Sequence, residues 1–280
     1  MAELWSGLHC GSFNDGVFAL VRGYIDESYD GKKIPEFFTL SCSLAHGGEW
    51  EFIEAAWLWI IREKNRELVA NGRNPISRYH AVDCFNRNNE FKGWSQEERN
   101  RFGVSLLEVF RHFPTAHVSL TISAKDVCDV WPENGDNPLH FAYNILLRLM
   151  MLEIGRFQNV LKISGKIALI YERCDYGEAL LRGFNRMMDD PTFPYSHVYS
   201  TLAPMGWEDC VPLQPADLVA YEFFRDAKRL AKSGGINRSL AALGEMPNFH
   251  GMAKLVPKSA LVKVREMHDL HLAKASGQVR

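Results

Sequence analysis

The chain has 280 residues, of which 46% are hydrophobic and 12% aromatic, and its formal net charge is -2 at pH 7. This composition supplies a sizeable core, allows one large domain or two small ones, and excludes a surface coated with positive charge for binding a nucleic-acid duplex. The 6 cysteines are scattered without a Cys-x-x-Cys pair, the first residues lack the basic-then-apolar pattern of a signal peptide, and no apolar run approaches about 18 residues. We therefore expect a cytoplasmic protein with reduced thiols and no membrane partner.

The sequence pattern predicts a series of strands and helices along the chain. In order, the pattern predicts a lead-in at 1–15, a strand at 17–26, a strand at 37–45, a helix at 50–70, an extended loop or short strand at 76–82, a helix at 95–113, a strand at 116–122, a helix at 138–157, a strand at 166–171, a helix at 177–188, a strand at 196–202 and a helix at 212–230. Ser95 and Glu98 have the spacing of a capping box. The simplest organisation is an α/β domain over 16–232, followed by a helical C-terminal extension over 233–280.

Two adjacent carboxylates, Asp26 and Glu27, stand at the end of the first predicted strand. Successive side chains of a strand point to opposite faces, so Asp26 shares a face with Tyr24 and Glu27 faces the other way with Ile25. Charges at the edge of a buried strand need a partner, a metal ion or water. Because α/β folds collect their chemistry at strand ends, we expect Asp26 to face a site and Glu27 to face a different layer.

Two further acidic residues directly follow or lie within apolar segments of the sequence. Glu172 closes the 166–171 strand, and Asp217 lies in the first turn of an apolar helix, where it shares a face with Gln214 and Tyr221. Asp217 has an alternative interpretation, which is that it complements the dipole of its own helix. Carboxylates on two strand ends and a facing helix are also a suitable set of ligands for Mg²⁺ or Mn²⁺, and two such ions can act together in phosphodiester cleavage.

The sequence resembles a known family at two places. Tyr24-Ile25-Asp26-Glu27-Ser28 and Gln214-Pro215-Ala216-Asp217-Leu218-Val219-Ala220-Tyr221 are similar to the two signature motifs of the bacterial family called domain of unknown function 3800. Tyr29 replaces the glycine that usually follows the serine. The resemblance implies a ribonuclease-H-like mixed sheet flanked by helices, with Asp26, Glu172 and Asp217 as metal-binding, catalytic acids. Relatives commonly have aspartate at the strand end, so Asp175 is an alternative to Glu172.

Other polar residues are candidates for the same site. His80-Ala81-Val82-Asp83 follows the predicted extended segment, in the interval where ribonuclease-H-like enzymes place a glutamate. Asp83 is a candidate fourth metal ligand and His80 a candidate proton shuttle, although a hydrogen-bonded turn explains the pair equally well. Lys125, Arg173 and Arg225 are candidate phosphate-binding residues or ordinary surface charges.

Three functions remain open from the sequence. The first is a Mg²⁺- or Mn²⁺-dependent nuclease acting on DNA or RNA. The second is a non-catalytic module that binds nucleic acid or protein, for example in a defence or toxin system. The third is a phosphohydrolase acting on small nucleotides. A basic surface continuous with the acidic site would favour the first over the third.

Overall fold

The computed structural model describes residues 21–31, 35–132, 138–158, 165–174, 176–234 and 238–275. The predicted lead-in at 1–15 lies outside these residues. The strands are β1 (Val21–Tyr29), β2 (Phe37–His46), β3 (Thr115–Ser123), β4 (Ile167–Glu172), β5 (Tyr199–Met205) and β6 (Phe249–Leu255). The helices are α2 (Gly47–Ala70), α3 (Ala81–Asn86), α4 (Gln96–Leu107), α5 (Val109–His112), α6 (Ala124–Val130), α7 (Pro138–Phe157), α8 (Gly177–Asp189), α9 (Leu213–Ser233), α10 (Arg238–Gly244) and α11 (Lys258–Ala275), with 3₁₀ turns at Asn89–Phe91 and Ser196–Val198.

Within the described residues, the strands form one mixed sheet in the order β5-β4-β1-β2-β3-β6. β1, β2 and β3 are antiparallel neighbours, whereas β4 runs parallel to β1, β5 to β4 and β6 to β3. β1 packs closely at Gly23, where a Cβ atom would lie 2.8 Å from the nearest atom of Leu169. The predicted α/β class is therefore confirmed, with a mixed sheet at its centre.

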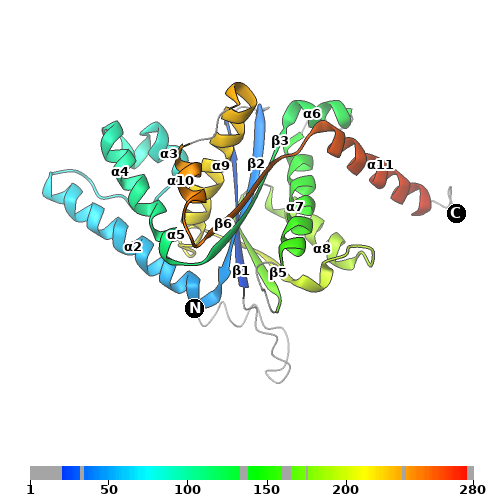
Figure 1. Ribbon diagram of the computed structural model, residues 1–280, viewed down its shortest axis with the longest axis horizontal. Coiled ribbons are helices and arrows are strands. Elements are labelled where there is room, and N and C mark those ends of the chain that lie inside the picture. The colour runs from blue at the N-terminus through cyan, green and yellow to red at the C-terminus, as the bar shows by residue number, and fades with distance from the viewer. Residues whose placement is uncertain are drawn as a thin grey trace, which may run out of the picture.

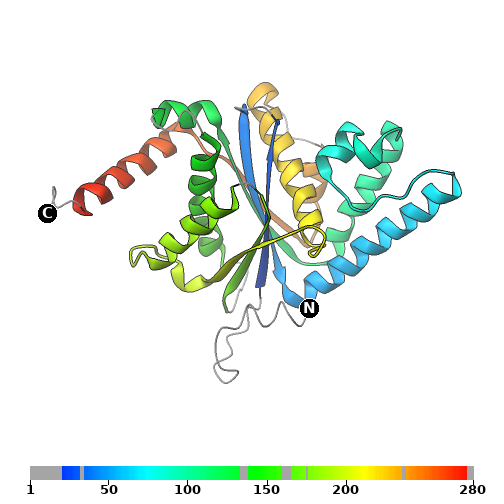
Figure 2. The same cartoon turned by 180° about the vertical axis from the view of Figure 1, so that it is seen from behind.

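Helices cover both faces of the sheet (Figures 1 and 2). One layer contains α2, α3, α4, α5, α9 and α10, and the other contains α6, α7, α8 and α11. Each layer has its own core: Tyr24 of β1 packs in the first, and Ile25 packs in the second. Among the helices that the structure describes, none combines the length and the apolar character needed to cross a bilayer.

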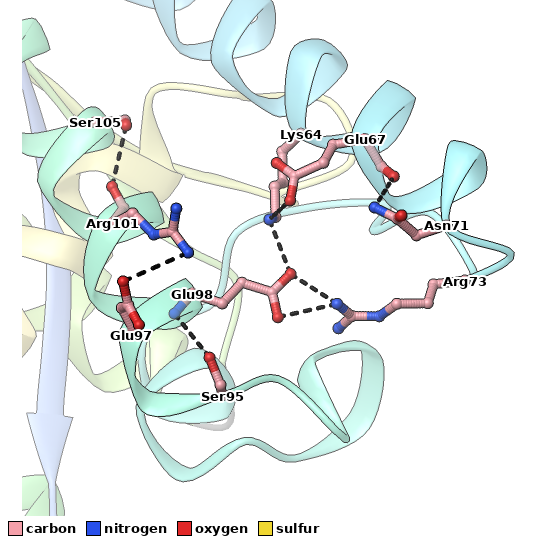
Figure 3. A network of polar contacts seen from close by, with 9 residues as sticks. All are labelled: Lys64, Glu67, Asn71, Arg73, Ser95, Glu97, Glu98, Arg101 and Ser105. Atoms are coloured by element: carbon pink, nitrogen blue, oxygen red, sulfur yellow. Dashed lines mark hydrogen bonds and ion pairs between the residues drawn. The ribbon is translucent and has the colours of Figure 1, made fainter.

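A polar network fastens α2 to α4 and to the segment between them (Figure 3). The Ser95 hydroxyl accepts a hydrogen bond of 3.0 Å from the Glu98 backbone N–H, which confirms the predicted helix start. The Glu98 carboxylate binds Arg73 at 2.7 and 2.9 Å and Lys64 at 2.8 Å. These contacts hold both ends of the connection between α2 and α4, which carries the His80-Asp83 pair.

Several predicted boundaries differ from the structure. β1 continues past Asp26 to Tyr29 because both residues pair with β2. The segment predicted to be extended over 76–82 becomes helical at Ala81, the first residue of α3. The C-terminal extension is not purely helical, since Phe249–Leu255 joins the sheet as β6 beside β3. Only Phe249 of β6 is buried, so this strand lacks the apolar run that would have predicted it.

Candidate active site

A cavity of about 940 Å³ opens at the C-terminal ends of the adjacent strands β1 and β4. Its lining includes the acidic side chains of Asp26, Glu27, Glu172 and Asp217, together with His80. β1, β4, α9 and the residue before α3 each contribute to this group. Four of the five predicted site residues (Asp26, Glu172, Asp217 and His80) thus line one cavity. The fifth, Asp83, is not one of the lining residues but is in contact with His80, and the alternative Asp175 is outside the described residues.

The two strands bring their acids together through their register. Ile25 and Tyr171 form the last pair between β1 and β4, so Asp26 and Glu172 are the next residues on adjacent parallel strands. The preceding residues, Tyr24 and Ile170, share the core on the α9 side of the sheet. Asp26 and Glu172 follow one residue after the Ile25–Tyr171 pair, and by alternation they face α9 as well.

Gln214 and Asp217 of α9 anchor the chain that leads into α3. The Gln214 side-chain oxygen accepts hydrogen bonds from the Tyr79 N–H at 2.8 Å and from the Trp57 indole at 3.2 Å. One turn later, Asp217 Oδ2 accepts a bond of 2.7 Å from the Ala81 N–H, at the start of α3. Asp217 therefore complements the N-terminus of α3 as well as lining the cavity, and this contact with another helix is what its position in the sequence did not reveal.

The anchoring role of Gln214 is testable by Gln214→Leu. Leucine fills a similar volume but leaves the buried N–H groups of Tyr79 and Trp57 without an acceptor, and each such loss costs about 1–3 kcal/mol. We expect the free energy of unfolding to fall by about 2–5 kcal/mol in urea titrations. Gln96→Leu, at an exposed position of α4, serves as the matched control and should change stability by less than about 0.5 kcal/mol. Wild-type stability in Gln214→Leu would contradict the anchoring role.

The acids of the cavity oppose one another's ionisation. Burial raises the pKa of Asp26 well above its ordinary range, and the charges of Asp217, Glu27 and Glu172 raise it further. Burial also raises the pKa of Asp217 to about 6, although His80 and the Ala81 N–H act in the opposite direction. Asp26 is 5% exposed and Asp217 is 8% exposed, so little water is available to stabilise either charge.

Glu27 contributes to the cavity more than the alternation of β1 predicted. It points toward the layer of α7, where the Tyr143 hydroxyl interacts with it, and it is also one of the residues that line the cavity. Burial raises the pKa of Glu27 to about 7, against the effect of Tyr143, and Glu172 adds to the rise. Glu27 therefore faces the other layer, as its strand position predicts, and lies among the lining residues of the cavity as well.

His80 and Asp83 form a pair at the start of α3. His80 Nδ1 lies 2.8 Å from Asp83 Oδ2. Burial opposes the ionisation of Asp83, but hydrogen bonds from His80 and Asn89 outweigh it and lower the pKa of Asp83. An ionised carboxylate only accepts hydrogen bonds, so Nδ1 carries the proton and Nε2 keeps its lone pair in neutral His80. The predicted turn and the predicted placement of His80 at the site are thus both present.

Basic side chains also lie at the site. Arg78 Nη1 is 3.7 Å from Glu172 Oε1, and its guanidinium lies 4.1 Å from the ring centroid of Trp207. Arg173 and Arg225, two of the three predicted phosphate-binding residues, line the cavity, whereas Lys125 lies on α6 and is not part of the lining. Lys228, Arg229 and Lys232 of α9 line it too. Their spacing from Arg225 follows one helical face, a signal that the sequence contained.

Among the described residues, no group of three or more His, Cys, Asp and Glu side chains is arranged to hold a metal ion by itself. The cavity instead offers separate carboxylates that sense one another's charge. Neither a scan against protein-family models nor a search of curated proteins finds a match to this sequence. The chemistry of the site is therefore inferred from its own residues.

Proposed function

We propose that this chain is a Mg²⁺- or Mn²⁺-dependent nuclease with a ribonuclease-H-like fold. The observation that carries the proposal is that Asp26, Glu172 and Asp217, distant in sequence, line one cavity and share its electrostatics. Clustered buried carboxylates are unfavourable in a purely structural role, because each one raises the energy of the others. A divalent cation relieves that repulsion, which gives the cluster a physical reason to exist.

The sheet supports the ribonuclease-H-like assignment. Three antiparallel strands, β3-β2-β1, continue into β4 and β5, both parallel to β1, and helices pack on both faces. This order agrees with the fold implied by the resemblance to domain of unknown function 3800. β6 and the helices around it are additions to that core.

The donor set suits a hard cation. Every candidate ligand at the cavity end offers carboxylate oxygen, and Mg²⁺ usually takes one or two protein carboxylates and keeps several waters. We propose Asp26 and Asp217 as direct ligands, with Glu172 binding directly or through water, and Asp83 acting through His80. Ser28, next to Glu27 on β1, is 4% exposed, lines the cavity, and its Oγ has no hydrogen-bond partner among the described residues. An ordered water or phosphate oxygen would satisfy it.

Each residue then has a defined task. A bound divalent ion would polarise the phosphodiester and activate water. The acids place that charge at the end of β1, while Asp83 fixes the tautomer of His80 so that Nε2 can accept a proton from water or return it to the leaving group. Arg78, held by Glu172 and Trp207, supplies positive charge beside the acids.

The second candidate is a non-catalytic module that binds nucleic acid or protein. It is favoured by one observation, the use of Asp217 Oδ2 to hold the start of α3, which gives this acid a structural role without any metal. The basic residues of α9 that line the cavity together with the acids favour the first candidate over the third, a phosphohydrolase of small nucleotides, because a basic surface continuous with the acidic site suits a backbone with many phosphates.

The test is a cleavage assay with the wild-type chain. We expect labelled single-stranded oligonucleotides to be cut in Mg²⁺ or Mn²⁺ and to remain intact in EDTA. Free nucleoside triphosphates, incubated in parallel, distinguish the small-nucleotide alternative. Intact oligonucleotides at every concentration of both metals would contradict the proposal, and the Asp26→Asn variant controls for contaminating nucleases.

A further inference from the structure

The C-terminal half of α9 carries a cationic face, formed by Arg225, Lys228, Arg229 and Lys232. Spacings of three, four and seven residues place these side chains on one side of the helix, and they line the same cavity as the acids. In Figure 1 this part of α9 extends to the end of the sheet at which β1 finishes. With a rise of about 1.5 Å per residue, the face is roughly 10 Å long. The cavity thus has an acidic end and a basic side.

Arg229 and Lys232 are the charges of this face that are most available to a ligand, since Arg225 is paired with Glu222 at 2.9 Å. Arg229 is exposed and forms no ion pair among the described residues. Lys232 pairs with Glu36 at 3.2 Å, but the two side chains are 56% and 43% exposed. Lys228 lies 3.9 Å from Asp30, at the outer limit of an ion pair. The exposed pair of Lys232 and Glu36 contributes little to stability, so a phosphate can replace it.

A second, independent feature lies between the acids and the cationic face. The Ser28 hydroxyl lines the cavity, and it is buried without a hydrogen-bond partner among the described residues. Ser28 shares its strand face with Asp26, two residues earlier, and therefore faces α9. A buried hydroxyl without a partner is unfavourable, and a ligand oxygen in the cavity would supply one.

The depth of the acids selects the shape of the ligand. Asp26 and Asp217 are almost fully buried, so a phosphate reaches them only by entering the cavity. A duplex has a persistence length of about 50 nm and bends at a cost, whereas a single strand bends freely. The aromatic neighbours on α9, Tyr221 and Phe224, line the cavity but are only 7% and 5% exposed, so they present little ring surface for base stacking. Recognition by backbone charge fits these surroundings better than recognition of bases.

We propose that the cationic face of α9, with Ser28 at its acidic end, binds the sugar-phosphate backbone of a single-stranded nucleic acid and directs it toward the carboxylates. This inference rests on the proposed nuclease function for the chemistry at that end. Binding itself depends on the cationic face, to which Ser28 adds one contact. The occupant is therefore a chain of several phosphates, not a free nucleotide.

The test measures binding apart from cleavage. Fluorescence anisotropy with a labelled single-stranded 12-mer of DNA or RNA, in EDTA, compares Arg229→Gln/Lys232→Gln with the matched control Lys92→Gln/Lys263→Gln, all in an Asp217→Asn background. Each lost phosphate contact lowers the slope of log K against log salt by about 0.7 for a single strand, so we expect a decrease of about 1.4 and roughly tenfold weaker binding. The control, which removes the same charge at exposed positions, should retain its slope and affinity.

Three results would overturn the inference: equal affinity of the two double variants, equal or tighter binding of a duplex, or binding of a mononucleotide as tight as that of the 12-mer. Ser28→Ala should keep its melting temperature and lose a few-fold in affinity; unchanged affinity would remove Ser28 from the binding surface. Cleavage by the wild type together with unaffected binding in Arg229→Gln/Lys232→Gln would leave the nuclease proposal intact. Weaker binding by Arg229→Gln/Lys232→Gln, without any cleavage by the wild type, would support the binding surface and contradict the nuclease proposal.

Discussion

The Asp217→Asn variant should fold normally and lose metal-dependent cleavage by about 10²–10⁴-fold. A catalytic metal supplies several kcal/mol of transition-state stabilisation, and each 1.4 kcal/mol is a factor of ten in rate. The asparagine carbonyl can still accept the Ala81 N–H bond, so the start of α3 stays in place while one buried charge disappears. The measurement is the initial rate of oligonucleotide cleavage in Mg²⁺, with circular dichroism and melting in EDTA.

Asp209→Asn is the matched control, because it makes the same exchange at an exposed position just before α9. It should cleave at the wild-type rate. Asp217→Ala separates the two roles of the side chain, since it removes both the charge and the acceptor for Ala81. It should lose stability as well as activity. Full activity in Asp217→Asn would end the catalytic assignment and favour the binding module.

Without metal, the protein should become less stable as the pH rises from 4.5 to 7.5. The pKa of Asp217 is about 6 in the folded state, and an unfolded aspartate titrates at about 3.9. Between these values the folded state binds more protons than the unfolded state, so the free energy of unfolding falls as the pH increases. Asp217 alone accounts for about 2 kcal/mol over this range, which corresponds to roughly 4–8 °C in melting temperature. Asp26 and Glu27, whose pKa values are also raised, act in the same direction.

Millimolar Mg²⁺ or Mn²⁺ should restore much of this stability at pH 7.5. The ions should have little effect at pH 4.5, where protons compete with them for the carboxylates. The measurement is differential scanning fluorimetry at both pH values, with EDTA or metal. Asp217→Asn is the control, and it should show a smaller pH dependence and a reduced metal shift. A melting temperature that is flat or increases from pH 4.5 to 7.5 in EDTA would count against the buried acidic cluster.

Much of the architecture follows from local sequence. The apolar runs that lead into Asp26 and Glu172 are strands because they fill two cores at once, and their hydrophobicity is visible in any short window. Asp26 could be placed on the α9 side by simple alternation. Gln214 and Asp217 could be placed on one helical face by their spacing.

The remainder depends on tertiary contacts that no local pattern contains. α3 begins at Ala81 because Asp217, 136 positions later, accepts its N–H. Glu27 is one of the residues that line the cavity, although its strand position places it on the other face of the sheet. β6 pairs with β3 through its backbone, while most of its side chains face solvent. The cationic face of α9, in contrast, was readable as a helical periodicity beyond Arg225.

The hydrogen bonds that Gln214 and Asp217 of α9 accept from Tyr79 and Ala81 also bear on how the protein is made in the cell. Domains form as the chain leaves the ribosome, from the N-terminal end onward. A nascent chain that has not reached residue 217 contains β1 and β4 but lacks Asp217. It therefore lacks both the last acid of the cavity and the acceptor that holds Ala81, the residue next to His80. Contacts between such distant positions form late, because the long intervening loop must be closed first. A ribosome-bound fragment would therefore lack a complete acidic cluster, and the cavity would acquire its full set of carboxylates only after synthesis has passed α9.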